Sequence, residues 1–165
     1  MVLIRLFNKI IFELVSLQPN KLDAKIILNN LHELVQEDPP LTIRLLTGLA
    51  RYRPDIFTET LLKLADSIQL TVNSLEVVYG ISLLVVIDQA FLDAYVAKWF
   101  HNCTDLDTAP KKRNIRLICR FIMELIKKGI FDISKRKDLW LHYCTFFDTF
   151  GNIKDFKDLL MRSGK

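Results

Sequence analysis

The sequence predicts an all-α protein, and three observations support this fold class. Only five glycines and five prolines occur in 165 residues, fewer turn residues than a sheet-rich protein of this length needs. Apolar residues recur at spacings of three and four along most of the chain, which is the period of an amphipathic helix. Half of the residues are hydrophobic and a quarter are charged, so the chain can bury the core of a folded domain.

Short breaks separate the expected helices, and helices joined by short loops pack as antiparallel neighbours. We therefore expect a right-handed α-α superhelix of HEAT or armadillo type, with about nine helices in antiparallel pairs. A chain of 165 residues is long enough for one domain and short for two, so residues 1–165 are expected to form a single helical-repeat domain. Whether this domain is a complete protein or a fragment of a longer one stays open.

The first half is expected to hold four helices, over residues 3–17, 20–36, 40–52 and 55–69. The first is apolar enough to suggest a signal peptide, but charges at every fourth position give it the polar stripe of an amphipathic helix. Asn20 is the expected cap of the second helix, and Pro39 disfavours its continuation. Pro54 suits the start of the fourth helix because its missing N–H would be unpaired there. Ile26 and Leu62 are expected on inward faces.

The second half is expected to hold five helices, over residues 74–87, 91–100, 110–128, 135–150 and 153–161. The expected caps are Asn73 or Ser74 for the first, Asp88 for the second and Ser134 for the fourth. Gly129 suits the left-handed position that ends the third. These residues fix the expected starts and stops.

Two parts of this half are less regular. Residues 74–87 are apolar almost all round, as expected of a helix with neighbours on both sides. A strand over residues 83–87 is an open alternative, because periodicity alone does not distinguish short apolar runs, and the helical context favours a helix. Residues 102–109 are polar and are expected to form the longest loop.

The residues needed for catalysis or ligand binding are not grouped in this sequence. The three histidines lie on different expected helices, and the glycines are too isolated to form a phosphate loop. The serines occur in neither a G-x-S-x-G nor an S-x-x-K context. We therefore expect no enzyme activity, no catalytic residue, no cofactor, no metal and no small-molecule substrate.

Cysteine usage and apolar run lengths bear on the compartment. Cys103, Cys119 and Cys144 are odd in number and form no C-x-x-C pair, so neither a disulfide framework nor a zinc site is indicated. Free thiols are typical of a reducing compartment. The longest apolar run, residues 77–87, is about half of the ~20 residues that cross a bilayer. We expect no membrane span and a cytoplasmic protein, with the nucleus as the alternative.

Positive charge is concentrated in one segment. Residues 111–137 contain ten basic and two acidic side chains, a net charge of +8, whereas the whole chain carries +4. The remainder is therefore acidic, with a net charge of −4. Such asymmetry is typical of a protein with a basic interaction surface.

The helix expected from Pro110 has two distinct faces. Lys112, Arg116 and Arg120 step by four residues and share one side, while apolar residues occupy the other. One interpretation is a solvated cationic surface, and the other is a docking surface for an acidic protein segment or a phosphate backbone. The candidate partner-binding residues are Lys112, Arg113, Arg116, Arg120, Lys127, Lys128, Lys135, Arg136 and Lys137.

Aromatic residues cluster in the helix expected over 135–150 (Trp140, Tyr143, Phe146, Phe147 and Phe150). They favour a buried core over a peptide-binding groove. Because aromatics that could stack on bases are expected inside, sequence-specific binding of single-stranded RNA is poorly supported.

The run R-F-I-M-E-L, Arg120 to Leu125, followed by Gly129-Ile130-Phe131, resembles the middle-domain family named after eukaryotic initiation factor 4G. Within that family it is most similar to the first such domain of the nonsense-mediated mRNA decay up-frameshift adaptor. The resemblance implies a non-enzymatic helical scaffold in messenger RNA translation or surveillance. It implies helicases or other adaptors as protein partners, RNA as an optional partner, and positional roles for Arg113, Arg116, Arg120 and Glu124, while the basic face itself favours proteins with acidic surfaces.

An alternative function class stays open beside this one. The same helical pattern fits a protein-interaction module of a trafficking or signalling complex with no RNA role. Co-purifying proteins would distinguish the two, since one predicts RNA factors and the other vesicle or cytoskeletal proteins.

Overall fold

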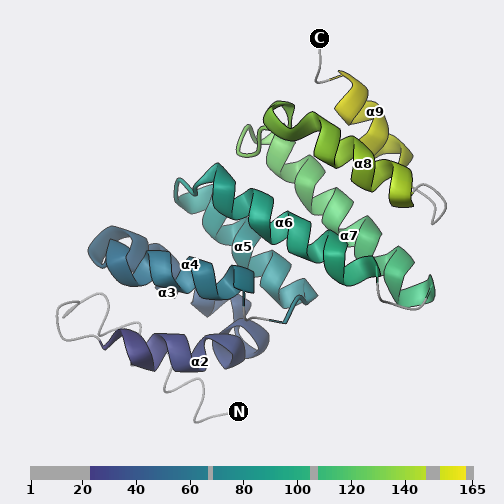
Figure 1. Ribbon diagram of the computed structural model, residues 1–165. Coiled ribbons are helices and arrows are strands. Elements are labelled where there is room, and N and C mark those ends of the chain that lie inside the picture. Colours follow the sequence, from purple (N-terminus) through teal and green to yellow (C-terminus); the bar gives the residue numbers. More distant parts are fainter. Residues whose placement is uncertain (1–22, 67–68, 105–107, 148–152, 163–165) are drawn as a thin grey trace. The chain divides into compact units, whose positions relative to one another are not determined.

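The computed structural model describes residues 23–66, 69–104, 108–147 and 153–162. Within these ranges every regular element is a helix, which confirms the all-α prediction (Figure 1). The first expected helix, 3–17, lies outside the described residues. The described helices are α2 (Ala24–Glu37), α3 (Pro39–Tyr52), α4 (Pro54–Asp66), α5 (Val72–Leu84), α6 (Gln89–Thr104), α7 (Thr108–Lys127), the 3₁₀ helix η2 (Ser134–Arg136), α8 (Lys137–Phe147) and α9 (Lys154–Arg162).

The chain divides into two compact units, residues 1–87 and 88–165. Each unit has its own apolar core, of which Leu31 and Leu46 are fully buried examples in the first and Ile122 and Leu160 in the second. The single domain expected from the chain length stays a prediction.

Helices of the first unit stack in the manner of helical repeats. Helix α2 packs on α3 and α4, and α3 packs on α4 and α5. Helices α2 and α3 thus each contact both the next helix and the one after it, and α2 also contacts α5; Figure 1 shows these helices side by side. This arrangement is typical of α-solenoids and agrees with the predicted helical-repeat architecture.

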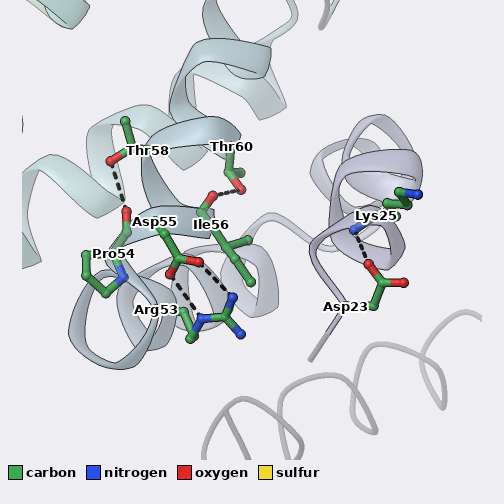
Figure 2. Close-up of polar contacts among 8 residues, drawn as sticks. All are labelled: Asp23, Lys25, Arg53, Pro54, Asp55, Ile56, Thr58 and Thr60. Carbon is green, nitrogen blue, oxygen red and sulfur yellow. Dashed lines mark hydrogen bonds and ion pairs between the residues drawn. The ribbon is translucent and has the colours of Figure 1, made fainter. Parts of the chain in front are cut away.

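Single residues separate the first three of these helices. Asp38 ends α2 and caps α3, its carboxylate accepting a hydrogen bond of 3.1 Å from the Leu41 amide. The buried Thr42 hydroxyl donates to the Leu34 carbonyl across the junction at 2.8 Å. Helix α2 itself begins after Asp23, whose carboxylate accepts from the Lys25 amide (Figure 2), so Asp23 and not Asn20 is the cap.

The turn between α3 and α4 follows the sequence prediction. Pro54 is the first residue of α4. Arg53 donates from Nε and Nη2 to the two carboxylate oxygens of Asp55, at 3.0 and 2.7 Å, and Figure 2 shows this paired contact. The hydrogen bonding raises the pKa of Arg53 and lowers the pKa of Asp55. The Thr58 and Thr60 hydroxyls donate back to carbonyls one turn earlier in the same helix (Figure 2).

Helix α5 begins earlier than the sequence suggested. Thr71 is its cap and forms a reciprocal pair with Ser74, so the expected cap at Asn73 or Ser74 is wrong. Asn73 is used elsewhere, because its amide donates to the Gln36 carbonyl at 2.7 Å. The Gln36 amide also donates to the Thr71 hydroxyl at 2.9 Å, so these contacts join the start of α5 to the end of α2.

Helix α5 also ends earlier than expected, at Leu84, and Val85 has an extended backbone. Neither the helix through residue 87 nor the strand over 83–87 is present. Leu83, Leu84 and Val86 are exposed, so the apolar composition of this stretch does not mark burial on both sides. Ile26 and Leu62 are exposed as well, contrary to expectation.

In the second unit, α6 packs on α7, α7 packs on α9, and α8 packs on α9. Helix α6 continues to Thr104 and α7 begins at Thr108, so the long loop predicted over 102–109 is wrong. The physical reason is Cys103, which is buried four residues after the buried Trp99 and so continues the inward face of α6. The preceding polar residues His101 and Asn102 are exposed.

The 135–150 segment starts differently from its prediction. Ser134 lies inside the 3₁₀ helix, and both its amide and its hydroxyl donate to the Asp132 carboxylate, at 2.9 and 2.6 Å. Ser134 is therefore not the cap of α8, and it donates to Asp132 instead. Helix α8 itself begins at Lys137 and is described as far as Phe147.

Of the aromatic cluster predicted to be core, Trp140 is buried and Tyr143 is half-buried, and the side chains of Phe146, Phe147 and Phe150 lie outside what the structure describes. Trp140 is fully buried, and its ring centroid lies 5.7 Å from that of Phe131 and 6.2 Å from that of Phe100. Phe100 also stacks on Tyr143 at 4.6 Å. These rings join α6, α8 and the segment after α7.

None of the described helices is both long enough and apolar enough to cross a membrane.

Gly80 provides a test of the α3–α5 contact. A Cβ atom at this position would lie 2.8 Å from Cγ1 and 3.3 Å from Cγ2 of Ile43, closer than carbon atoms pack. We expect Gly80→Ala to lower the free energy of unfolding by about 1 kcal/mol, because overpacking outweighs the gain in helix propensity. In an Ile43→Ala background the same change should instead raise stability. Urea denaturation of the four proteins measures both effects, and a stabilising Gly80→Ala in both backgrounds would contradict the close contact.

Candidate functional site

Helix α7 has the two faces that its sequence predicts. Ile115, Ile118, Ile122 and Leu125 are buried at helical spacing, together with Cys119 and Phe121. Leu117 and Ile126, also expected inside, are only partly buried. Since α7 packs on both α6 and α9, its apolar stripe belongs to the core of the second unit.

The end of α7 is set by Gly129, as predicted. Gly129 has a φ of +68°, a left-handed conformation that few other residues adopt without strain. Its amide donates to the Ile126 carbonyl at 2.9 Å, and the Ile130 amide donates to the Leu125 carbonyl at 2.9 Å. These two bonds form a Schellman motif, which satisfies the last carbonyls of the helix. The chain then turns into the core at Phe131.

The opposite side of α7 is exposed and cationic. Lys112, Arg113, Arg116 and Arg120 are all exposed. Across the described residues, the salt bridges found involve other basic side chains, and none includes Lys112, Arg113 or Arg116. Burial of the apolar stripe therefore holds these cations toward solvent on a rigid helix.

Glu124 lies at the edge of this cationic face. Lys127 donates to its carboxylate at 2.8 Å. That hydrogen bond is the main reason that the pKa of Glu124 lies below its ordinary value, and the charges of Lys127, Arg120 and Lys128 lower the pKa further. Glu124 is thus ionised and already engaged by Lys127.

The second basic cluster, residues 135–137, has different surroundings. Arg136 Nη1 lies 3.8 Å from Asp93 Oδ2 on α6. Lys137 is half-buried at the start of α8, and the side chain of Lys135 is outside what the structure describes. Arg136 is therefore paired loosely with Asp93, as Lys127 of α7 is paired with Glu124, whereas none of the salt bridges among the described residues includes Lys112, Arg113 or Arg116.

Asp93 belongs to a polar network that the sequence analysis missed. It is largely buried, and its Oδ1 accepts a hydrogen bond of 3.2 Å from the Gln89 amide. The side-chain oxygen Oε1 of Gln89 in turn accepts from the Asp132 backbone amide at 3.1 Å. The available signal was an acid one position after Leu92, at the edge of the inward face of α6. The network joins the start of α6 to the segment that follows α7.

Other reactive side chains do not form a site in the described part of the chain. No group of three or more His, Cys, Asp or Glu side chains there could hold a metal ion. Cys103, Cys119 and Cys144 are buried. Burial, and then the neighbouring Cys144 and Cys103, raises the pKa of the Cys119 thiol, which opposes formation of the reactive thiolate.

The Asp93 network predicts that removing Asp93 lowers the stability of the protein more than removing Glu124 does. Asp93→Ala should lower the free energy of unfolding by about 1–2 kcal/mol, because Gln89 and Arg136 lose their buried partner. Glu124→Ala should change stability little, since its pair with Lys127 is exposed to water. Urea denaturation followed by circular dichroism compares the two variants. Equal losses would show that the network does not hold the unit together.

Comparison with known proteins places the chain in a family other than the one its motif suggested. The family described as "CCR4-NOT transcription complex subunit 11" matches residues 20–162. A Dictyostelium discoideum protein described as "CCR4-NOT transcription complex subunit 11" is 28% identical over 128 residues. That similarity covers 70% of this chain but only 19% of the relative.

The resemblance to the initiation factor 4G middle-domain family, and to its decay-adaptor member, is therefore wrong. The structure explains the error. Phe121, Ile122 and Leu125 of the motif are buried, Glu124 pairs with Lys127, and Gly129 ends the helix. Any basic amphipathic helix packed on a core needs these residue types at these spacings. The chain belongs to the family of CCR4-NOT transcription complex subunit 11.

Proposed function

We propose that this chain is a non-enzymatic helical scaffold that mediates protein–protein contacts within a CCR4-NOT type complex and so takes part in the regulation of messenger RNA. The family match over residues 20–162 carries this proposal. The relative is described as a subunit of a complex, and a subunit needs surfaces for other proteins. A stacked arrangement of helices supplies such surfaces.

The exposed cations are the candidate surface. They comprise the α7 residues Lys112, Arg113, Arg116, Arg120 and Lys127, with Lys128 directly after the helix. Exposed arginines favour partners with carboxylates, because the guanidinium group forms paired hydrogen bonds with them. Residues 135–137 are secondary candidates, since Arg136 is engaged by Asp93. Work in the cytoplasm, or in the nucleus, is compatible with this role.

The role in translation or surveillance rested on the family resemblance that is now corrected, and it is not part of this proposal. Direct RNA binding and a trafficking or signalling role are alternatives that one experiment separates from the scaffold.

Co-purification from cells tests the scaffold. The full-length family member is tagged and purified, and a matched protein carries Arg116→Glu and Arg120→Glu. We expect other subunits of the complex to co-purify with the unchanged protein. The recovered amount of at least one subunit should fall about tenfold with the double variant, because the new glutamates repel its acidic surface. Lys25→Glu with Lys63→Glu, on the first unit, is the matched control.

Recovery of vesicle or cytoskeletal proteins in place of complex subunits would contradict the proposal. Filter binding of the 165-residue chain to single-stranded RNA at several salt concentrations tests the RNA alternative, since phosphate contacts make affinity fall steeply with salt. Binding that is absent or insensitive to salt would remove that alternative.

A further inference from the structure

We propose that the exposed face of α7 is a docking line for an acidic protein segment that also carries an apolar side chain. The docking line consists of Lys112, Arg116, Arg120, Met123 and Lys127. This inference rests on the proposed scaffold function and names the chemistry of the partner at its candidate surface.

The spacing of the docking line is regular. Its members follow one another at steps of four, four, three and four residues, so they lie on one side of the helix. Each step of four advances about 6 Å along the axis, and the line therefore runs for about four turns. The four cations are exposed. A partner segment with carboxylates at a similar repeat could contact several of them together.

Met123 lies within this line and not on the buried stripe. Its side chain is partly exposed between Arg120 and Lys127, whereas its neighbour Ile122 is fully buried. Methionine is flexible and polarisable, and it adapts to differently shaped apolar partners. An apolar side chain surrounded by cations fits a partner that alternates acidic and apolar residues.

The partly exposed Met123 and the burial of the aromatic side chains favour a protein partner over RNA. Proteins that bind single-stranded nucleic acid without sequence preference stack its bases on exposed aromatic rings. In the described part of residues 88–165, each phenylalanine, tyrosine and tryptophan is buried or half-buried, and Tyr95, Trp99 and Phe121 are core residues. The cations of the docking line could contact the phosphates of RNA, but the line contains no aromatic ring on which a base could stack.

The docking line has a defined end. The pair formed by Glu124 and Lys127 lies in the last turn of α7, and Gly129 then turns the chain inward. Beyond it, Arg136 Nη1 lies 3.8 Å from Asp93 Oδ2. We therefore assign the partner contact to α7 alone.

Fluorescence anisotropy with three defined probes tests this inference on the 165-residue chain. The first is a synthetic peptide of about 20 residues with glutamates and leucines on one helical face, a typical helix-docking ligand. The second replaces each leucine with serine, and the third is a single-stranded oligouridine of matched length. The expected order of affinity is the leucine peptide first, the serine peptide second and the RNA last.

Three variants assign the contacts. Arg116→Glu with Arg120→Glu should weaken the leucine peptide about tenfold or more, since two attractive charges become repulsive. Met123→Gln should weaken binding of the leucine peptide about fivefold and leave binding of the serine peptide unchanged, because only the apolar contact is lost. Lys25→Glu, at an exposed lysine of the first unit, should leave binding of both peptides unchanged. Circular dichroism confirms that each variant is folded.

Equal affinity for the two peptides, or no effect of Met123→Gln, would overturn the apolar part of the inference. Binding that survives the double arginine reversal in a folded protein would overturn the docking line. Tighter binding of RNA than of either peptide would overturn the choice of a protein partner. Failure with these probes, while complex subunits still co-purify with the full-length protein, rejects this inference and leaves the scaffold function standing.

Discussion

Burial of the α7 stripe is the constraint on which the second unit depends. Ile118, Ile122 and Leu125 have no exposed surface, and α7 packs on both α6 and α9 through this side. A helix is rigid, so fixing one side fixes the other. Arg116 and Arg120 are therefore held toward water as a consequence of core packing. The same burial supplies the stability and orients the candidate surface.

Polar contacts at the helix ends determine where the elements meet. In the first unit, Gln36 joins the end of α2 to Thr71 and Asn73 at the start of α5. In the second, Gln89 joins Asp93 to the backbone of Asp132. Each contact satisfies groups that a helix end or a buried side chain would otherwise leave unpaired. Hydrogen bonds between side chains distant in sequence thus join helix ends, in addition to the apolar packing of each unit.

Features governed by local chemistry were predictable from the sequence. Pro54 begins α4 and Gly129 ends α7, because each position has a backbone requirement that few residues meet. The two faces of α7 followed from periodicity. That Thr71 caps α5 was not predictable, because several neighbouring polar residues can cap a helix. Asn73 is not the cap, and its side-chain amide donates to the distant Gln36 carbonyl.

The length of α6 and the family of the chain were not predictable from local sequence either. Cys103 extends α6 through a polar stretch because one buried side chain outweighs the polarity of its neighbours. The Arg120 to Leu125 run suggested the wrong family, because its residues meet the general needs of a basic packed helix. Matches along residues 20–162 as a whole identified the family that a single helix could not.

Zero-length carbodiimide crosslinking of the assembled complex tests most directly whether α7 faces a partner. This reagent joins a lysine to a carboxylate only where the two already form a close ion pair. We predict crosslinks from Lys112 and Lys127 to acidic residues of another subunit. Crosslinks formed only by lysines of the first unit, such as Lys25 and Lys63, would contradict the assignment of the docking surface to α7.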